Sequence, residues 1–148
     1  MENTKQQALA FCKDQLAQKR SELQKAIALL QQSLTAESKS TAGDKHETGR
    51  AMIQLEREKL GFQLKELESQ EALLHKINLQ QTTPFIALGS YVSTTLMNYF
   101  LSISIRKIAG SNAFAISVQS PIGKQLLGKK LGETFTFNGK EHKITGVL

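Results

Sequence analysis

The chain has 148 residues, of which 40% are hydrophobic and 6% aromatic, and it carries a formal net charge of +6. A chain of this length forms one domain or two small ones. The low aromatic content and the absence of Trp favour a coiled coil joined to a small α+β domain over one large globule. The single Cys12 excludes an intramolecular disulfide and fits a reducing cytoplasm, and the polar N-terminus lacks a signal-peptide core.

Two long helical patterns follow one another, at about residues 5–37 and 47–79. In each, large aliphatic residues recur mainly at steps of three, four or seven, which is typical of a coiled-coil seam. The first seam holds Leu9, Leu16, Leu23, Ile27, Leu30 and Leu34, and the second holds Ile53, Leu60, Leu64, Leu67 and Leu74. Residues 38–43 offer turn and capping residues, so the chain should reverse there. We therefore predict an antiparallel helical hairpin over residues 1–80.

The predicted tip of this hairpin, near residues 41–50, carries Asp44 and Glu47 where the second helix begins. At that spacing two side chains lie on one face of a helix, and paired carboxylates can hold a divalent cation through oxygen ligands. Asp at the N-cap with Glu at the N3 position is also a capping box, which needs no metal. Spacing alone favours the capping box, although a capping carboxylate still presents an outward lone pair.

Residues 84–148 predict a second domain. The stretch from 84 to 105 is long enough for a membrane span, but it holds six Ser or Thr residues and a strand-like composition, so we expect strands and no membrane contact. Ser120 and Pro121 mark a helix start, and Asn138-Gly139 marks a hairpin turn. The expected strands are 86–92, 97–108, 113–118, 133–137 and 140–147, with a turn at 109–112 and a helix stop at Gly128. The pattern predicts an antiparallel sheet with one short helix.

The positive charge lies mainly in this second domain. Residues 84–148 hold seven Lys or Arg against two Asp or Glu, a balance of +5, whereas residues 1–83 hold twelve against eleven. A basic small domain favours an acidic protein surface or nucleic acid as a partner. A solvated basic surface accounts for the same charge without any partner.

Two features together resemble the bacterial Gre transcript cleavage factors. They are the Asp44 and Glu47 pair between two long helices, and the run ISVQSPIGKQLLGKKLG at residues 116–132. The resemblance covers nearly the whole chain. It implies an α+β protein in which an FKBP-like domain, residues 84–148, docks at the rim of the RNA polymerase secondary channel. The coiled-coil hairpin then extends to the polymerase active centre.

The resemblance also implies a mechanism and its partners. Asp44 and Glu47 would help the polymerase retain a second Mg²⁺, and the polymerase would cleave the 3′ end of backtracked RNA. The protein would be no enzyme by itself, would hold no cofactor alone, and would act as a cytoplasmic monomer. Ser120, Pro121 and Ile122 match the family segment that grips the polymerase, while helix capping and core packing explain the same three residues.

The tip departs from the common family pattern Gly-Asp-Leu-Ser-Glu-Asn. Lys45 and His46 replace the Leu-Ser pair, and Thr48 replaces Asn. The Lys45 charge can contact an RNA phosphate or repel a cation, and His46 is either a ligand-type group or a solvated loop residue. Two alternatives therefore stay open: a non-catalytic regulator that binds the secondary channel, and a scaffold whose coiled coil pairs with another chain.

Overall fold

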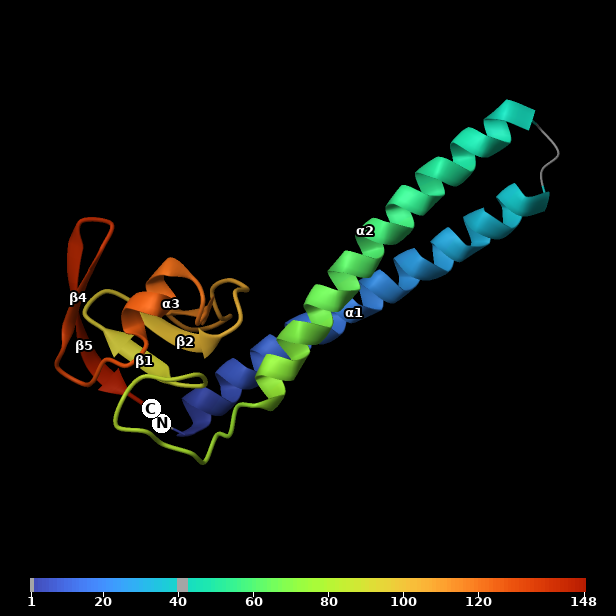
Figure 1. The fold of residues 1–148 in the computed structure, drawn as a ribbon. Coiled ribbons are helices and arrows are strands. Elements are labelled where there is room, and N and C mark those ends of the chain that lie inside the picture. The colour runs from blue at the N-terminus through green and yellow to red at the C-terminus, as the bar shows by residue number, and fades with distance from the viewer. Residues whose placement is uncertain (1, 40–42) are drawn as a thin grey trace. The chain divides into compact units, whose positions relative to one another are not determined.

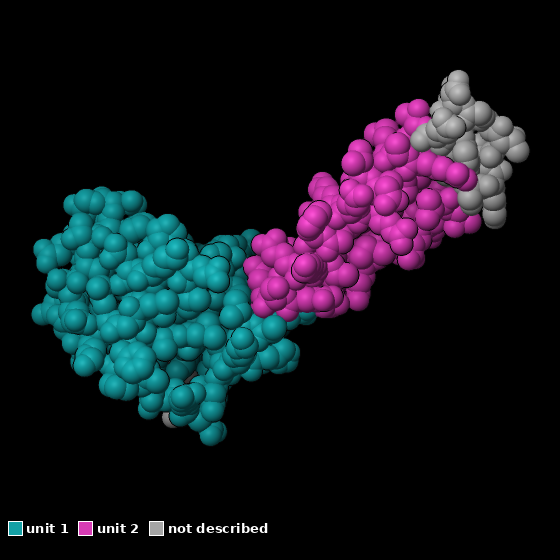
Figure 2. Space-filling view, viewed as in Figure 1, with its two compact units in different colours: residues 1–15, 71–148 teal, residues 16–70 magenta. Residues whose placement is uncertain are grey.

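A computed structural model describes the backbone of residues 2–39 and 43–148, and the side chains of residues 4–36 and 48–148. Two helices come first, followed by five strands and one short helix (Figure 1). Their bounds are α1 (Glu2–Lys39), α2 (Gly43–His75), β1 (Tyr91–Thr94), β2 (Asn98–Ser102), β3 (Ala113–Ser117), α3 (Pro121–Leu126), β4 (Thr134–Phe137) and β5 (Lys140–Val147). The chain forms two compact units, residues 16–70 and residues 1–15 with 71–148 (Figure 2).

The unit of residues 16–70 is a hairpin of two helical arms. Its seam is well packed at Leu16, Leu23, Leu60 and Leu67, each at most 7% exposed. Nearer the tip the predicted seam residues are less buried, since Ile27, Leu30 and Ile53 are half-buried and Leu34 is 39% exposed. The predicted hairpin is confirmed. At ~1.5 Å per residue, the 33 residues of α2 extend about 50 Å.

The other unit contains a five-stranded sheet in the order β3-β2-β1-β5-β4. The pairs β1–β2, β1–β5 and β4–β5 are antiparallel, whereas β2 and β3 are parallel. The fold class expected from the sequence is confirmed, because the strands with one short helix follow the hairpin. The expectation of an entirely antiparallel sheet is wrong for the β2–β3 pair.

The parallel pair results from the path of residues 103–112. The sequence predicts one strand over residues 97–108, but β2 ends at Ser102. The following segment lies against the opposite edge of β3: the Ile105 N–H donates to the Ala115 carbonyl (3.3 Å), and the Ala115 N–H donates to the Arg106 carbonyl (3.2 Å). The chain therefore passes the position of β3 before it turns back, and β3 enters between β2 and this segment in the same direction as β2.

The strand predicted from residue 86 begins only at Tyr91. Residues 86–90 form a turn in which Gly89 has φ of +88°, and the Ala87 N–H donates to the Ser90 hydroxyl at 3.0 Å. A glycine is required because this φ disfavours other residues. The Ile86 N–H donates to the Lys129 carbonyl (2.8 Å), so this turn is fastened to the chain that leaves α3.

The core of the sheet unit is apolar and closed. Val92, Leu101, Leu126 and Ile144 are fully buried, and Phe135 is nearly so. The predicted β4–β5 hairpin is confirmed, since Asn138 (φ 53°) and Gly139 (φ 76°) both adopt the positive φ of a type I′ turn.

The first turns of α1 belong to the sheet unit. The Cys12 side chain is fully buried with its Sγ 3.6 Å from the Ser102 Oγ, and the Arg106 guanidinium donates to the Gln15 Oε1 at 3.0 Å. Burial raises the pKa of the Cys12 thiol. The predicted division into residues 1–80 and 84–148 stays a prediction. Among the described residues, neither long helix offers a stretch apolar enough to cross a membrane.

Candidate functional site

The predicted acidic tip lies at the start of α2. The helix begins at Gly43, so the backbone places positions 44 and 47 in its first turn, three residues apart and hence on one face. The side chains of Asp44, Lys45, His46 and Glu47 lie outside the described residues. The predicted metal ligands Asp44 and Glu47 therefore stay a prediction. Among the residues whose side chains the structure describes, no group of three or more His, Cys, Asp or Glu could hold a metal ion.

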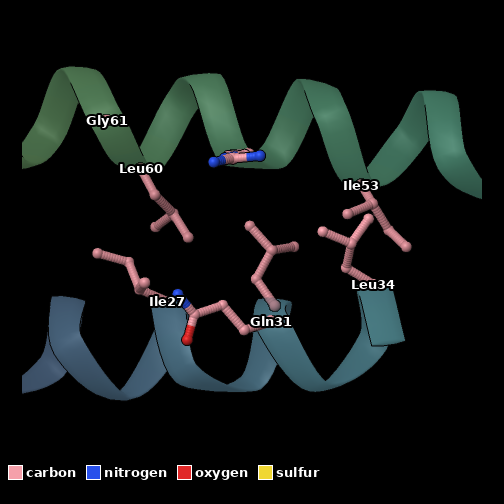
Figure 3. A pocket seen from close by; sticks show the side chains of 8 residues that line it. Ile27, Gln31, Leu34, Ile53, Leu60 and Gly61 are labelled. Atoms are coloured by element: carbon pink, nitrogen blue, oxygen red, sulfur yellow. The ribbon is translucent and has the colours of Figure 1, made fainter. Parts of the chain in front are cut away.

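The hairpin seam below the tip is incompletely filled. A cavity of about 360 Å³ opens between the arms, lined on α1 by Ile27, Leu30, Gln31 and Leu34, and on α2 by Ile53, Arg57, Leu60 and Gly61. Figure 3 shows the Ile27, Leu34, Ile53 and Leu60 side chains pointing into the space between the helices. Gly61 contributes no side chain there, and Gln31 and Arg57 are polar residues on its lining. The arms near the tip are therefore held by fewer apolar contacts than the arms further down.

The second predicted site, Ser120 to Ile122, forms the first turn of α3. Ser120 is the N-cap, whose Oγ accepts a hydrogen bond from the Gly123 N–H (3.1 Å) and donates one to the Ser117 carbonyl (2.6 Å). Pro121 occupies N1 and is exposed, while Ile122 packs partly on the sheet core. The structure brings the three residues together, but the Ser120 hydroxyl is occupied by capping, and of the three only Pro121 is exposed.

Gly123 fixes α3 against the end of β3. A Cβ added at this glycine would lie 2.1 Å from the Ser117 carbonyl oxygen, closer than real Cβ contacts allow. Only a residue without a side chain permits this approach. The role of Gly123 is not visible in the sequence, because nothing in a one-dimensional pattern shows which backbone segment a glycine approaches.

Three exposed apolar side chains lie on the segments beside α3. Phe85, Leu127 and Leu131 are 43%, 40% and 63% exposed, and we call them the α3 apolar patch. The Gly128 N–H donates to the Ile86 carbonyl (2.8 Å), which joins the two segments that carry the patch. Lys124, Lys129 and Lys130 come from the same stretch of chain. Exposed apolar side chains with polar residues near them are typical of a protein-binding surface.

A family comparison covers this part of the molecule. Residues 89–147 match the sequence model of the family described as transcription elongation factor, GreA/GreB, C-terminal. Residues 89–147 therefore carry a GreA/GreB C-terminal domain. The matched residues of this GreA/GreB domain run from the turn before β1 to the end of β5, and they include Ser120, Pro121, Ile122 and Gly123. The resemblance to the Gre factors expected from the sequence is confirmed.

Solved structures similar to the chain include two Gfh1 proteins. The GreA factor homolog 1 (Gfh1) of Thermus thermophilus is 21% identical, with a TM-score of 0.37 over 95% of this chain and 94% of that chain. Thermus aquaticus Gfh1 is 25% identical, with a TM-score of 0.37 over 92% and 90%. No curated protein sequence matches the chain. The family match, and not the similarity to these structures, shows which family residues 89–147 belong to.

The α3 apolar patch was not expected from the sequence pattern. The α3 apolar patch is formed by residues that are unremarkable in sequence, because Phe85 stands next to the buried Ile86 and Leu127 next to the buried Leu126. A weak signal existed in the two lysines at positions 129 and 130, which interrupt the apolar residues of this stretch. The pairing of residue 86 with residues 128 and 129 brings the segment that carries Phe85 beside the segment that carries Leu127 and Leu131.

Proposed function

We propose that the chain acts on RNA polymerase as a Gre-type elongation factor that stimulates cleavage of backtracked RNA. The GreA/GreB domain would dock on the polymerase, and the helical hairpin would carry Asp44 and Glu47 into the secondary channel. The observation that supports this most strongly is the family match over residues 89–147, directly preceded in the chain by two long antiparallel helices.

The docking surface on this proposal extends beyond the predicted residues. Pro121 is exposed on the first turn of α3, and the α3 apolar patch lies on the segments that flank the same helix. Exposed apolar side chains next to lysines fit an acidic, partly apolar protein surface, because apolar burial supplies affinity and the charges steer association. The +5 balance of residues 84–148 supports the same partner.

The tip would supply carboxylate oxygens and no complete metal site. Mg²⁺ requires near-octahedral oxygen coordination, and two carboxylates supply only part of such a shell. Asp44 and Glu47 fit a cation whose remaining ligands belong to the polymerase, and the bound cation would activate water for phosphodiester hydrolysis. The chain itself contributes negative charge at the end of an arm about 50 Å long.

The test is cleavage in purified, deliberately backtracked elongation complexes with Mg²⁺ present. Wild type should release 3′ RNA fragments, and Asp44→Ala/Glu47→Ala should lose release while still binding the polymerase. Glu56→Ala/Glu58→Ala is the matched control, since it removes two exposed carboxylates from the same helix. This control should cleave like wild type.

A different outcome would favour the other candidate. Lys45 lies between the two predicted ligands and adds a positive charge that weakens cation binding. If wild type binds the polymerase but leaves backtracked RNA intact, the cleavage mechanism is wrong and the protein is a regulator that occupies the channel. If wild type does not bind the polymerase at all, the docking proposal fails as well.

A further inference from the structure

A small polar pocket lies where the two ends of the hairpin meet the linker and the turn before β1. It has a volume of about 150 Å³ and is lined by Lys5, Lys76, Asn78, Gln81, Thr83, Ala87, Leu88, Ser90 and Leu148. We call it the Lys5 pocket. All its residues belong to the unit of residues 1–15 and 71–148. Four separate stretches of the chain, at residues 5, 76–83, 87–90 and 148, therefore contribute to one small cavity.

The pocket has an excess of positive charge. Two lysine side chains line it, and no Asp or Glu side chain does. The last residue of the printed sequence, Leu148, also lines it, and an α-carboxylate there would offset one of the two positive charges. Lys5 is only 6% exposed, and no acidic partner of Lys5 is found among the described side chains. Burial alone lowers the pKa of Lys5, with no carboxylate to offset it. A buried ammonium without a counter-charge is costly, so such a group is usually paired.

The uncharged polar groups of the pocket also leave donors free. The Asn78 Oδ1 accepts from the Gln80 N–H (3.0 Å), which leaves the Asn78 amide NH₂ for another partner. The Ser90 Oγ accepts from the Ala87 N–H (3.0 Å), which leaves its hydroxyl hydrogen. The Thr83 hydroxyl is already used, because it donates to the Phe85 carbonyl at 2.5 Å. The Asn78 and Ser90 side chains can thus add hydrogen-bond donors to the two ammonium groups.

From this arrangement we propose that the Lys5 pocket binds a phosphate-type anion. Two ammonium groups and two neutral donors suit a compact dianion with several acceptor oxygens. Ligand pockets for drug-sized molecules measure roughly 300–1,000 Å³, so the pocket of about 150 Å³ has room for a single anionic group. The anion would contact both α1 and the residues that follow α2. Its binding would therefore hold the first turn of α1 against the chain that follows α2, both within the unit of residues 1–15 and 71–148.

Titration of the full-length protein with inorganic phosphate at constant ionic strength tests the proposal, with heat of binding and thermal midpoint as readouts. Wild type should bind saturably and its midpoint should rise with phosphate concentration. Lys5→Met and Lys76→Met should each weaken phosphate binding about tenfold or more, since each removes a charge-assisted hydrogen bond. Lys140→Met, which removes an exposed lysine outside the pocket, should bind like wild type.

Two further titrations, with acetate and with a nucleoside monophosphate, test which anion the pocket prefers. Acetate at the same ionic strength should bind more weakly than phosphate, because it offers fewer oxygens and a single charge. A nucleoside monophosphate should compete with phosphate only if the pocket accepts a phosphate attached to a larger molecule, and failure to compete assigns the site to the free ion. Phosphate also stabilises proteins without binding. A non-saturable rise of the same size in wild type, Lys5→Met and Lys76→Met would overturn the proposal.

Discussion

The sheet core and the distal hairpin seam are built from similar aliphatic residues but packed very differently. In the sheet unit, Leu101 and Ile144 are completely buried. In the seam near the tip, Leu34 is 39% exposed and a cavity of about 360 Å³ separates the arms. A sheet with a helix across it closes over its apolar residues, whereas two helices enclose only a narrow stripe between them.

The difference in packing suits different roles for the sheet unit and the distal part of the hairpin. The sheet unit has a closed core, which would hold the proposed docking surface in one shape, and the close approach of Gly123 to Ser117 fixes α3 on it. On the proposed function the distal arms need only length and a tip, and the lining of the cavity between them includes Gln31, Arg57 and Gly61. Stability should therefore depend strongly on the sheet core and weakly on the distal seam.

The largest expected effect is a core truncation. Leu101→Ala should lower the free energy of unfolding by about 2–5 kcal/mol, because it removes a buried side chain and leaves a cavity. Leu34→Ala should cost far less, since that side chain is already partly in solvent. Urea titrations of both variants, followed by circular dichroism, measure the difference. Equal losses would show that the two regions are equally packed.

Gly123→Ala should come next. The added methyl group meets the Ser117 carbonyl oxygen, and relief requires α3 to move, at a cost of about 1–3 kcal/mol. The same movement displaces Pro121 and should weaken polymerase binding. Gln125→Ala, an exposed change in the same helix, is the control and should alter neither quantity. Wild-type stability in Gly123→Ala would contradict the close approach.

Gly61→Ala should stabilise the hairpin by about 1 kcal/mol, since alanine has the better helix propensity. A Cβ at position 61 would meet no atom within 4 Å, so no clash offsets the gain. The reverse change Ala51→Gly, at another exposed position of α2, should lose a similar amount. Thermal unfolding monitored by helical circular dichroism compares them. A loss of stability in Gly61→Ala would mean that the seam closes over the glycine.

The smallest effect concerns Lys5 and pH. Burial lowers its pKa in the folded chain below the ordinary 10.5, so between the two values the unfolded chain binds more protons and stability rises with pH. Below the pKa of Lys5 in the folded chain, the full cost of burying its charge lowers the stability of the protein. Lys5→Met removes it, so the gain in stability should be largest at neutral pH and shrink toward pH 10.5, without added phosphate.

Lys140→Met provides the comparison for this prediction, because its side chain is exposed. Its difference from wild type should vary little over the same pH range. Unfolding free energies at several pH values between 7 and 10 give the two curves. Parallel curves for the two variants would show that Lys5 experiences no effective burial in solution.

The sequence by itself determined the helices and turns that depend on residues close together in the chain. Aliphatic spacing placed both long helices, the Ser120-Pro121 pair placed the start of α3, and Asn138-Gly139 placed the β4–β5 turn. The acidic pair Asp44 and Glu47 is also visible in sequence alone, and its assignment as metal ligands stays a prediction. Each of these signals depends on residues within one or two turns of each other.

Tertiary structure decided what depends on residues far apart in the chain. The parallel β2–β3 pairing arises from the return path of residues 103–112, and the α3 apolar patch arises because residue 86 pairs with residues 128 and 129. The Lys5 pocket combines the start of α1 with the chain beyond α2 and the turn before β1. Periodicity reports which side of an element is apolar, but the neighbour that covers that side is chosen by long-range packing.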